Sequence, residues 1–169
     1  MKTILIVEDT QANLDAAKAF FSTVSDNRFV YAVNRKEAEE LMDSVDGVIS
    51  DRDLPYEERV RTNELENGYA IIMNAKGKGL PAVLVSEHGR LNIFTAHPKH
   101  RYFESTFNHA SHMIGRKFDF ANKGDVAFID MFPGIYESDH VVTAQGFVGI
   151  SKTSPAAWQM AWQELQKQF

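Results

Sequence analysis

The chain has 169 residues, of which 44% are hydrophobic and 24% charged, as in an ordinary soluble globular domain. Its net charge of −5 gives no electrostatic reason to expect nucleic acid or an anionic membrane as a partner. The absence of cysteine excludes disulfides, thiolate metal sites and cysteine nucleophiles. No segment approaches the roughly eighteen consecutive apolar residues of a membrane span, so we expect a cytoplasmic protein.

Short apolar runs alternate with helical patterns through the first half of the chain. Continuous apolar runs are typical of strands buried on both faces, and three- and four-residue spacings are typical of amphipathic helices. Asp9 or Thr10 is the expected N-cap of the first helix. In chain order we expect a strand over 4–7, a helix over 14–24, a strand over 29–33, a helix over 35–43, a strand over 47–50, a helix from 69 to the glycine pair of "KGKG" (76–79) and a strand over 80–86.

The C-terminal segment predicts a last strand and a last helix. "GFVGIS" (146–151) is the expected strand. Ser154 and Pro155 form the usual start of a helix, as cap and first residue. Trp158 and Trp162 lie on one apolar stripe of that helix, which favours a role in the core. Strands alternating with helices in this way predict a doubly wound parallel α/β sheet.

The remaining segments are interpreted as insertions in a single domain of residues 1–169. One insertion covers about 56–66 and is expected to be an exposed loop. The other covers about 90–145, where a helix around 103–116 and a strand over "VAFIDMF" (126–132) are expected.

Acidic and polar side chains follow three of the predicted strands. Glu8 and Asp9 follow the first strand, Asp51 ends the third, and Ser86 ends the fourth. If the strand order is 2-1-3-4-5, the three carboxylates meet at the carboxyl edge of the sheet, where ligands bind in such folds. Clustered carboxylates repel one another unless a cation neutralises them. The pattern therefore predicts a Mg²⁺ site that leaves room for a phosphoryl group, with Lys152 after the last strand as a cationic partner.

The stretches "ILIVEDT", "DGVISDRDLP", "LPAVLVS" and the "SK" before the final helix together resemble the receiver domain of two-component response regulators. The resemblance implies a flavodoxin-like fold and a Mg²⁺-dependent signalling protein rather than a turnover enzyme. Asp51 would accept a phosphoryl group from a sensor histidine kinase or phosphotransfer protein, and an unknown downstream protein would receive the signal. By the same resemblance Mg²⁺ is held by Glu8, Asp9, Asp51 and the backbone carbonyl of Asp53, and the phosphoryl oxygens contact Ser86 and Lys152.

The sequence departs from the receiver pattern near its end. Thr153 follows Lys152 where the family has a proline, and Gly149 stands where the family has an aromatic switch residue. Phe147 has the same side-chain parity as Gly149 and is a candidate substitute. Several dozen extra residues also separate the fourth and fifth strands. These departures leave a second possibility open, a degenerate receiver that serves as a binding scaffold without phosphorylation.

The stretch "DRDLP" also resembles the first motif of haloacid-dehalogenase-type phosphatases, with Asp51 as nucleophile and Asp53 as general acid. Ser86 would supply the second motif, and the remaining motifs would come from Lys117 or Lys123, Asp125 and Asp130. That motif ordinarily ends the first strand of its sheet, whereas a complete strand–helix–strand–helix precedes it here. This alternative also leaves Glu8 and Asp9 without a role.

Histidines provide two further candidates. His109 and His112 lie three residues apart and would share a helical face, with His97 and His100 nearby. A zinc site needs three or four ligands in fixed geometry, and the spacing supplies no clear third ligand. His88 follows Ser86 by two residues and is expected near the phosphoryl site.

Overall fold

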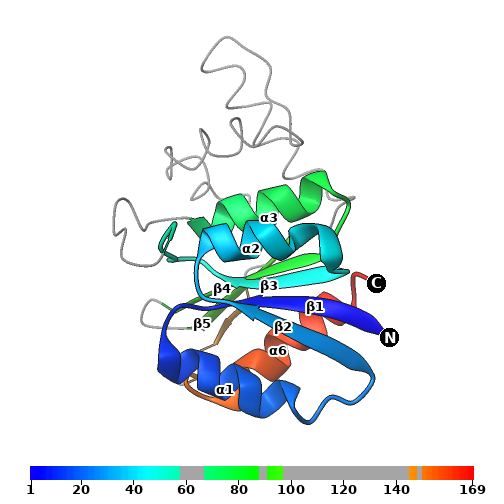
Figure 1. Ribbon diagram of the computed structural model, residues 1–169. Helices are drawn as coiled ribbons and strands as arrows, with labels where there is room; N and C mark the ends of the chain where they lie inside the picture. Colours follow the sequence, from blue (N-terminus) through cyan, green and yellow to red (C-terminus); the bar gives the residue numbers. More distant parts are fainter. Residues whose placement is uncertain (58–66, 88–90, 97–144, 148–149) are drawn as a thin grey trace.

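The computed structural model describes residues 1–57, 67–87, 91–96, 145–147 and 150–169 (Figure 1). Helices alternate with strands in the first half of the chain, as the apolar pattern predicts. The elements are β1 (Lys2–Val7), α1 (Gln11–Phe21), β2 (Asn27–Ala32), α2 (Arg35–Leu41), the 3₁₀ helix η1 (Met42–Ser44), β3 (Gly47–Asp51), α3 (Asn67–Gly77), β4 (Ala82–Glu87), β5 (Leu91–Ala96), β6 (Gln145–Phe147) and α6 (Pro155–Gln166).

The first four strands form a parallel sheet in the order β2-β1-β3-β4, which confirms that part of the predicted topology. Ile6 lies beside Tyr31 of β2 on one side and Ile49 of β3 on the other. Asp51 pairs with Val85 at the carboxyl end of β4. This register brings the ends of β1, β3 and β4 to one edge of the sheet.

The predicted five-stranded parallel order 2-1-3-4-5 is wrong beyond β4. The next strand in the sheet is β5, which runs antiparallel to β4, and β6 pairs antiparallel with β5. Only residues 88–90 separate β4 from β5, too few for the crossover that a parallel neighbour requires. The strand expected over 146–151 is β6, at the outer edge of this hairpin, and residues 150 and 151 are not part of a strand.

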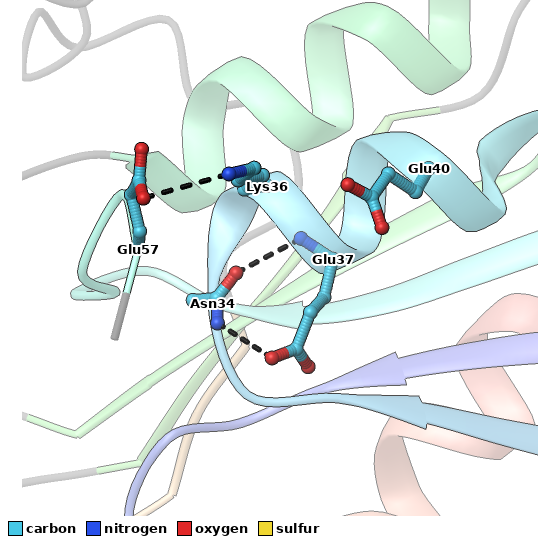
Figure 2. A pocket seen from close by; sticks show the side chains of 5 residues that line it. All are labelled: Asn34, Lys36, Glu37, Glu40 and Glu57. Atoms are coloured by element: carbon cyan, nitrogen blue, oxygen red, sulfur yellow. Dashed lines mark hydrogen bonds and ion pairs between the residues drawn. The ribbon is translucent and has the colours of Figure 1, made fainter.

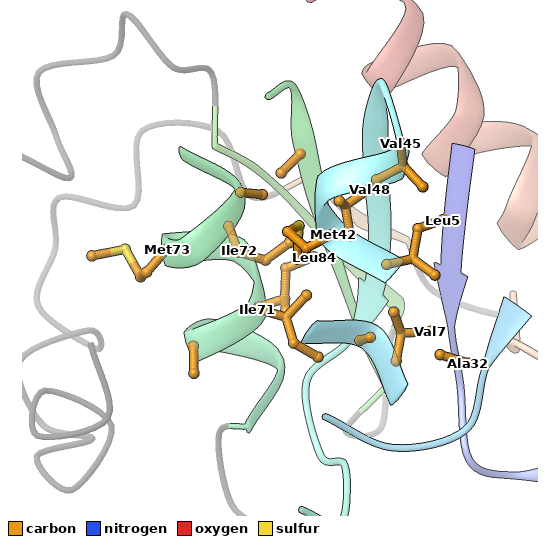
Figure 3. Close-up of a cluster of buried hydrophobic side chains, with 14 of the residues drawn as sticks. Leu5, Val7, Ala32, Met42, Val45, Val48, Ile71, Ile72, Met73 and Leu84 are labelled. Atoms are coloured by element: carbon orange, nitrogen blue, oxygen red, sulfur yellow. The ribbon is translucent and has the colours of Figure 1, made fainter. Parts of the chain in front are cut away.

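Helices cover both faces of the sheet, with α2 and α3 on one side and α1 and α6 on the other (Figure 1). Beneath α2 and α3, the side chains of Leu5, Met42, Val48, Ile71 and Leu84 belong to one buried apolar cluster (Figure 3). The second cluster joins α1 and α6 to the other face, and it contains both tryptophans of α6. The predicted place of these tryptophans in the core is confirmed.

The helix ends follow the sequence signals. Thr10 is at the N-cap position of α1, where its side chain makes no capping hydrogen bond, whereas the Ser154 hydroxyl accepts from the backbone N–H of Ala156 at the start of α6. After α3, Gly79 has a φ of 75°, a conformation that glycine adopts without a steric penalty. Among the described residues, no helix has both the length and the apolar character that spanning a membrane requires.

Candidate functional site

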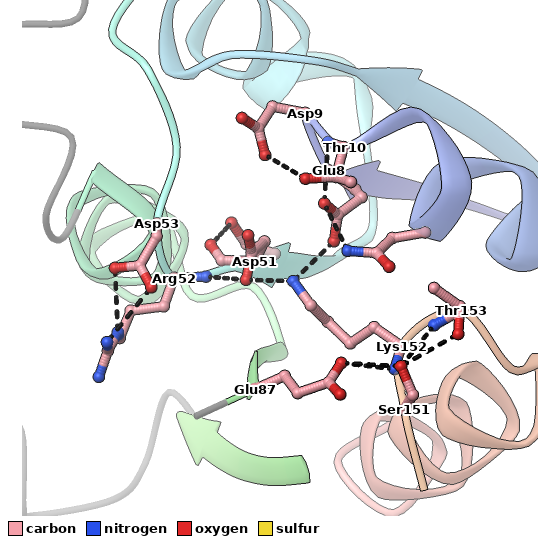
Figure 4. Close-up of polar contacts among 12 residues, drawn as sticks. Glu8, Asp9, Thr10, Asp51, Arg52, Asp53, Glu87, Ser151, Lys152 and Thr153 are labelled. Atoms are coloured by element: carbon pink, nitrogen blue, oxygen red, sulfur yellow. Dashed lines mark hydrogen bonds and ion pairs between the residues drawn. The ribbon is translucent and has the colours of Figure 1, made fainter. Parts of the chain in front are cut away.

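Three charged side chains from distant parts of the chain meet at the carboxyl edge of the parallel strands (Figure 4). Glu8 follows β1, Asp51 ends β3, and Lys152 precedes α6. The Lys152 Nζ lies 2.9 Å from Glu8 Oε2 and 2.7 Å from Asp51 Oδ1. All three residues are buried, with exposed fractions of 0%, 5% and 5% respectively. The lysine therefore bridges two carboxylates that are largely shielded from water.

Both oxygens of the Glu8 carboxylate are bonded. Oε1 accepts from the backbone N–H of Thr10 at 3.0 Å and from Asn13 Nδ2 at 3.2 Å, while Oε2 accepts from Lys152. Glu8 thus bonds a backbone N–H at the start of α1 and joins the charged cluster at the same time. Sequence reasoning missed Asn13; the available signal was a polar residue beside Leu14 on the buried side of α1.

Burial changes the protonation of Asp51. The pKa of this carboxyl is raised to about 7, mainly by the loss of water and further by the Glu8 charge, while the charge and hydrogen bond of Lys152 oppose the rise. The backbone N–H of Arg52 donates to Asp51 Oδ1 at 2.7 Å and also favours the ionised form. Asp51 is therefore a carboxylate whose charge responds to its neighbours near neutral pH.

Lys152 stays charged in this setting. Burial by itself would lower the pKa of the ammonium group, but the charges of Asp51 and Glu8 outweigh burial and raise the pKa above its ordinary value. One buried cation thus faces two buried acids, and the exposed Asp9 adds a third acid. The cluster therefore carries surplus negative charge whenever all three acids are ionised.

The acidic cluster has the donor chemistry of a hard divalent cation. Glu8, Asp9 and Asp51 each offer a carboxylate oxygen, and these oxygens lie within 4.8 Å of one another. Oxygen ligands of this kind suit Mg²⁺ or Ca²⁺. Ser86 Oγ is a second indication of a polar ligand, since it is buried and has no hydrogen-bond partner among the described residues. A buried hydroxyl is ordinarily bonded, so a bound group would satisfy it.

The side chain of Asp53 lies outside this cluster. Its carboxylate is paired with Arg52, with Arg52 Nε 3.1 Å from Oδ1 and Arg52 Nη2 3.2 Å from Oδ2 (Figure 4). The predicted metal ligand at this residue is the backbone carbonyl, and that role stays a prediction.

The start of α3 packs tightly against the end of β3. The N–H of Gly68 donates to the Arg52 carbonyl at 3.0 Å, and a Cβ at position 68 would lie 1.9 Å from the carbonyl oxygen of Asp51. Only a glycine fits this approach without a shift of the backbone beside Asp51.

The loop after Asp51 is also fixed from α2 and α3. The backbone N–H of Arg35 donates to the Pro55 carbonyl at 3.0 Å, and Asn67 Nδ2 donates to the Leu54 carbonyl at 2.7 Å. Arg35 Nη1 in turn donates to Asn67 Oδ1 at 3.2 Å. These bonds attach the loop that follows Asp51 to the starts of α2 and α3.

A second group of acids lines an open groove at the start of α2 (Figure 2). Asn34 Oδ1 accepts from the N–H of Glu37, and Asn34 Nδ2 donates to the Glu37 carboxylate, so these residues cap the helix. Lys36 Nζ lies 3.5 Å from Glu57 Oε2, and both side chains are exposed. The groove, which Glu40 also lines, combines several acids with one lysine but keeps them in water.

Other residues singled out from the sequence lie outside the described residues. They are His88, His97, His100, His109, His112, Lys117, Lys123, Asp125, Asp130 and Gly149, together with the helix expected around 103–116, the strand expected over 126–132 and most of the loop expected over 56–66.

The described structure thus brings together Glu8, Asp9, Asp51 and Lys152, with a buried, unsatisfied hydroxyl at the end of the adjacent strand. No family model matches the chain, and no curated protein or solved structure matches it at a significant level.

Proposed function

We propose that this chain is a phosphoacceptor signalling protein with a flavodoxin-like, receiver-type fold, in which Asp51 accepts a phosphoryl group from a sensor histidine kinase or a phosphotransfer protein. The observation that carries the proposal is the buried contact of Lys152 with both Glu8 and Asp51. A lysine in that position can bond the Asp51 carboxylate before the transfer and the phosphoryl oxygens after it, because its ammonium group can donate to either set of oxygens.

Glu8, Asp9 and Asp51 are the residues that would hold Mg²⁺, with the carbonyl of Asp53 as a further ligand. Bound there, Mg²⁺ would neutralise negative charge on the phosphoryl oxygens during transfer. The close oxygens of the three acids support this part of the proposal.

Asp51 must be ionised to act as the nucleophile. An Asp51 oxygen attacks the phosphorus atom in line with the bond to the leaving group, which is the imidazole of a phosphohistidine or the carboxylate of an acyl phosphate. Because the pKa of Asp51 is near 7 without a metal, a second cation beside Lys152 would favour the reactive form. Lys152 and the Ser86 hydroxyl would then donate to the new phosphoryl oxygens.

The signal would leave through contact with another protein, and the cytoplasm is the compartment that suits such a partner.

The phosphatase alternative also uses Asp51 as the nucleophile but needs Asp53 as the general acid. Its side chain is paired with Arg52 and lies apart from Lys152, which favours phosphoacceptance over phosphatase activity.

The test is Mg²⁺-dependent phosphorylation by acetyl phosphate, followed by intact mass spectrometry. We expect one added phosphoryl group in the wild type and none in Asp51→Asn, because the amide is not a nucleophile for this step. Lys36→Met, in the groove of Figure 2, is the matched control and should react like the wild type.

Each other outcome changes the assignment. Release of phosphate from the donor without a stable adduct would favour the phosphatase alternative. An adduct that survives in Asp51→Asn would identify a different nucleophile. No reaction and no Mg²⁺ binding would leave a receiver-type fold that acts as a binding scaffold.

A further inference from the structure

Lys152 lies in a segment without regular structure. Residues 150–153 belong to neither a strand nor a helix, and α6 begins only at Pro155. A sheet ladder therefore does not fix the backbone from which the lysine reaches Glu8 and Asp51. Its position must come from other contacts, since the side chain itself has four rotatable bonds.

Both backbone polar groups of Lys152 are bonded to side chains. Its N–H donates to Glu87 Oε2 at 2.8 Å, and its carbonyl accepts from Trp158 Nε1 at 2.8 Å. Glu87 is the last residue of β4, next to Ser86, and Trp158 is a fully buried residue of α6. The lysine is thus fastened to the sheet on one side and to the final helix on the other (Figure 4 shows the Glu87 side).

The neighbours of Lys152 extend this arrangement. Ser151 Oγ donates to the same Glu87 oxygen at 3.1 Å and accepts from the N–H of Thr153 at 3.3 Å and from Thr153 Oγ1 at 3.0 Å. A proline at position 153 could not donate the backbone bond. The segment is therefore closed by its own side chains and anchored by one carboxylate of β4.

We propose that Glu87 and Trp158 are positioning residues that set the place of the Lys152 ammonium group between Glu8 and Asp51. The inference rests on the proposed function for its chemical meaning, because Lys152 is the residue that would bind the transferred group. Glu87 is well suited to the task since one oxygen accepts from two successive residues of the segment.

The contacts of the Lys152 ammonium group tolerate little displacement. Displacement of a catalytic contact by about 1 Å can lower a rate by about a hundredfold. The Nζ of Lys152 contacts two carboxylates at 2.7 and 2.9 Å, so a shift of its backbone would lengthen at least one contact. Glu87 and Trp158 would thus influence Asp51 without touching it.

The experiment measures the position of Lys152 without phosphorylation. Folded protein free of divalent cations is treated briefly with acetic anhydride, and acetylation of Lys152 relative to the exposed Lys36 is measured by mass spectrometry. We expect Glu87→Ala to raise the relative rate roughly tenfold, because two hydrogen bonds are lost. Glu87→Gln keeps an accepting oxygen and should restore most of the protection, and Trp158→Phe should raise the rate several-fold.

A second readout connects position with chemistry. In the acetyl phosphate reaction, Glu87→Ala should lower the maximal rate of Asp51 phosphorylation about tenfold with little change in the donor concentration needed for half-maximal rate. Glu87→Gln should again recover most of the rate. Glu57→Ala removes an exposed carboxylate from the groove of α2 and should change neither readout.

The two proposals fail separately. Unchanged Lys152 acetylation in both Glu87→Ala and Trp158→Phe, with the variants folded by circular dichroism, would overturn the positioning role. A lower unfolding midpoint with unchanged acetylation would do the same, because it would assign Glu87 to stability alone. If wild type accepts no phosphoryl group but the variants expose Lys152, the positioning role stands and the proposed function falls.

Discussion

Two acidic regions of this molecule have similar composition but differ in how far their charged side chains are buried. The cluster around Lys152 and the groove around Lys36 each combine several carboxylates with one lysine. In the first, the side chains of Lys152 and Asp51 are both 7% exposed and 2.7 Å apart. In the second, Lys36 and Glu57 are 52% and 43% exposed and 3.5 Å apart.

The difference lies in burial rather than in charge. Water screens the groove, where an ion pair contributes little to stability. Protein surrounds the charges of the Lys152 cluster in place of water, so each charged group is stabilised mainly by the other charged groups. A change of charge, such as the arrival of a cation or a phosphoryl group, therefore has large consequences in the cluster and small ones in the groove.

Removal of the buried cation should have the largest effect. Lys152→Met leaves Glu8 and Asp51 buried without a positive partner, and breaking a buried pair in this way costs about 3–5 kcal/mol. We expect that loss in the free energy of unfolding at pH 8 without divalent cations, measured by urea denaturation. A loss below about 1 kcal/mol at that pH would mean that the cluster is solvated like the groove.

The pH dependence of stability should show the cost of charging Asp51. Burial raises its pKa from 3.8 to about 7, so between these values the folded protein holds a proton that the unfolded chain has released. Stability must then fall as pH rises from about 4 to 7, by about 2–4 kcal/mol. The raised pKa of Lys152 keeps its ammonium group charged throughout this range.

The measurement is urea unfolding at pH 5, 6, 7 and 8 without divalent cations. The asparagine side chain of the Asp51→Asn variant cannot ionise, so the stability of this variant should fall much less as pH rises. A wild-type profile without this decline, or an equal decline in the variant, would contradict a buried carboxyl with a raised pKa.

Divalent cations should stabilise the cluster by a smaller amount. At tenfold excess over its dissociation constant, Mg²⁺ bound only to the folded state should add about 1.4 kcal/mol. Asp9→Asn removes an exposed ligand and should weaken the Mg²⁺ effect with little change in stability without metal. Thermal unfolding with and without Mg²⁺ tests this, with Glu57→Gln in the groove as the matched control. If Asp9→Asn and Glu57→Gln reduced the stabilisation by Mg²⁺ equally, the effect would come from general screening of charge by the ion and not from binding at the cluster.

Much of the fold could be predicted because its signals are local. The buried strands are continuous apolar runs, and Ser154 with Pro155 marks the start of α6. Glu8 after β1 and Asp51 at the end of β3 could be placed near each other from the sequence, because parallel strands end at the same edge of a sheet. The alternation of strands and helices predicted a parallel sheet, and the order assumed for its first four strands, β2-β1-β3-β4, is the order in the structure.

The rest depends on contacts between distant residues. The antiparallel turn after β4 was missed, although the short connection to "LNIFTA" (91–96) favours a hairpin over a crossover. Lys152 could be placed at this edge from its position after the last predicted strand and from the receiver resemblance, but the contacts of its backbone with Glu87 and Trp158 could not be predicted. Glu87 lies 65 residues from Lys152 in the chain, and the indole of Trp158 gave only a core signal.

Removal of the exposed Lys36 should have the smallest effect on the free energy of unfolding. Lys36→Met breaks the ion pair with Glu57, but water solvates the carboxylate that remains, so the expected loss is below about 0.5 kcal/mol. The effect should become smaller in 0.5 M NaCl, because salt at that concentration shortens the range of interactions between exposed charges to a few ångströms. Urea denaturation of both lysine variants in low and high salt measures this directly. A loss from Lys36→Met as large as that from Lys152→Met would show that charge number, rather than burial, sets the energetics of both regions.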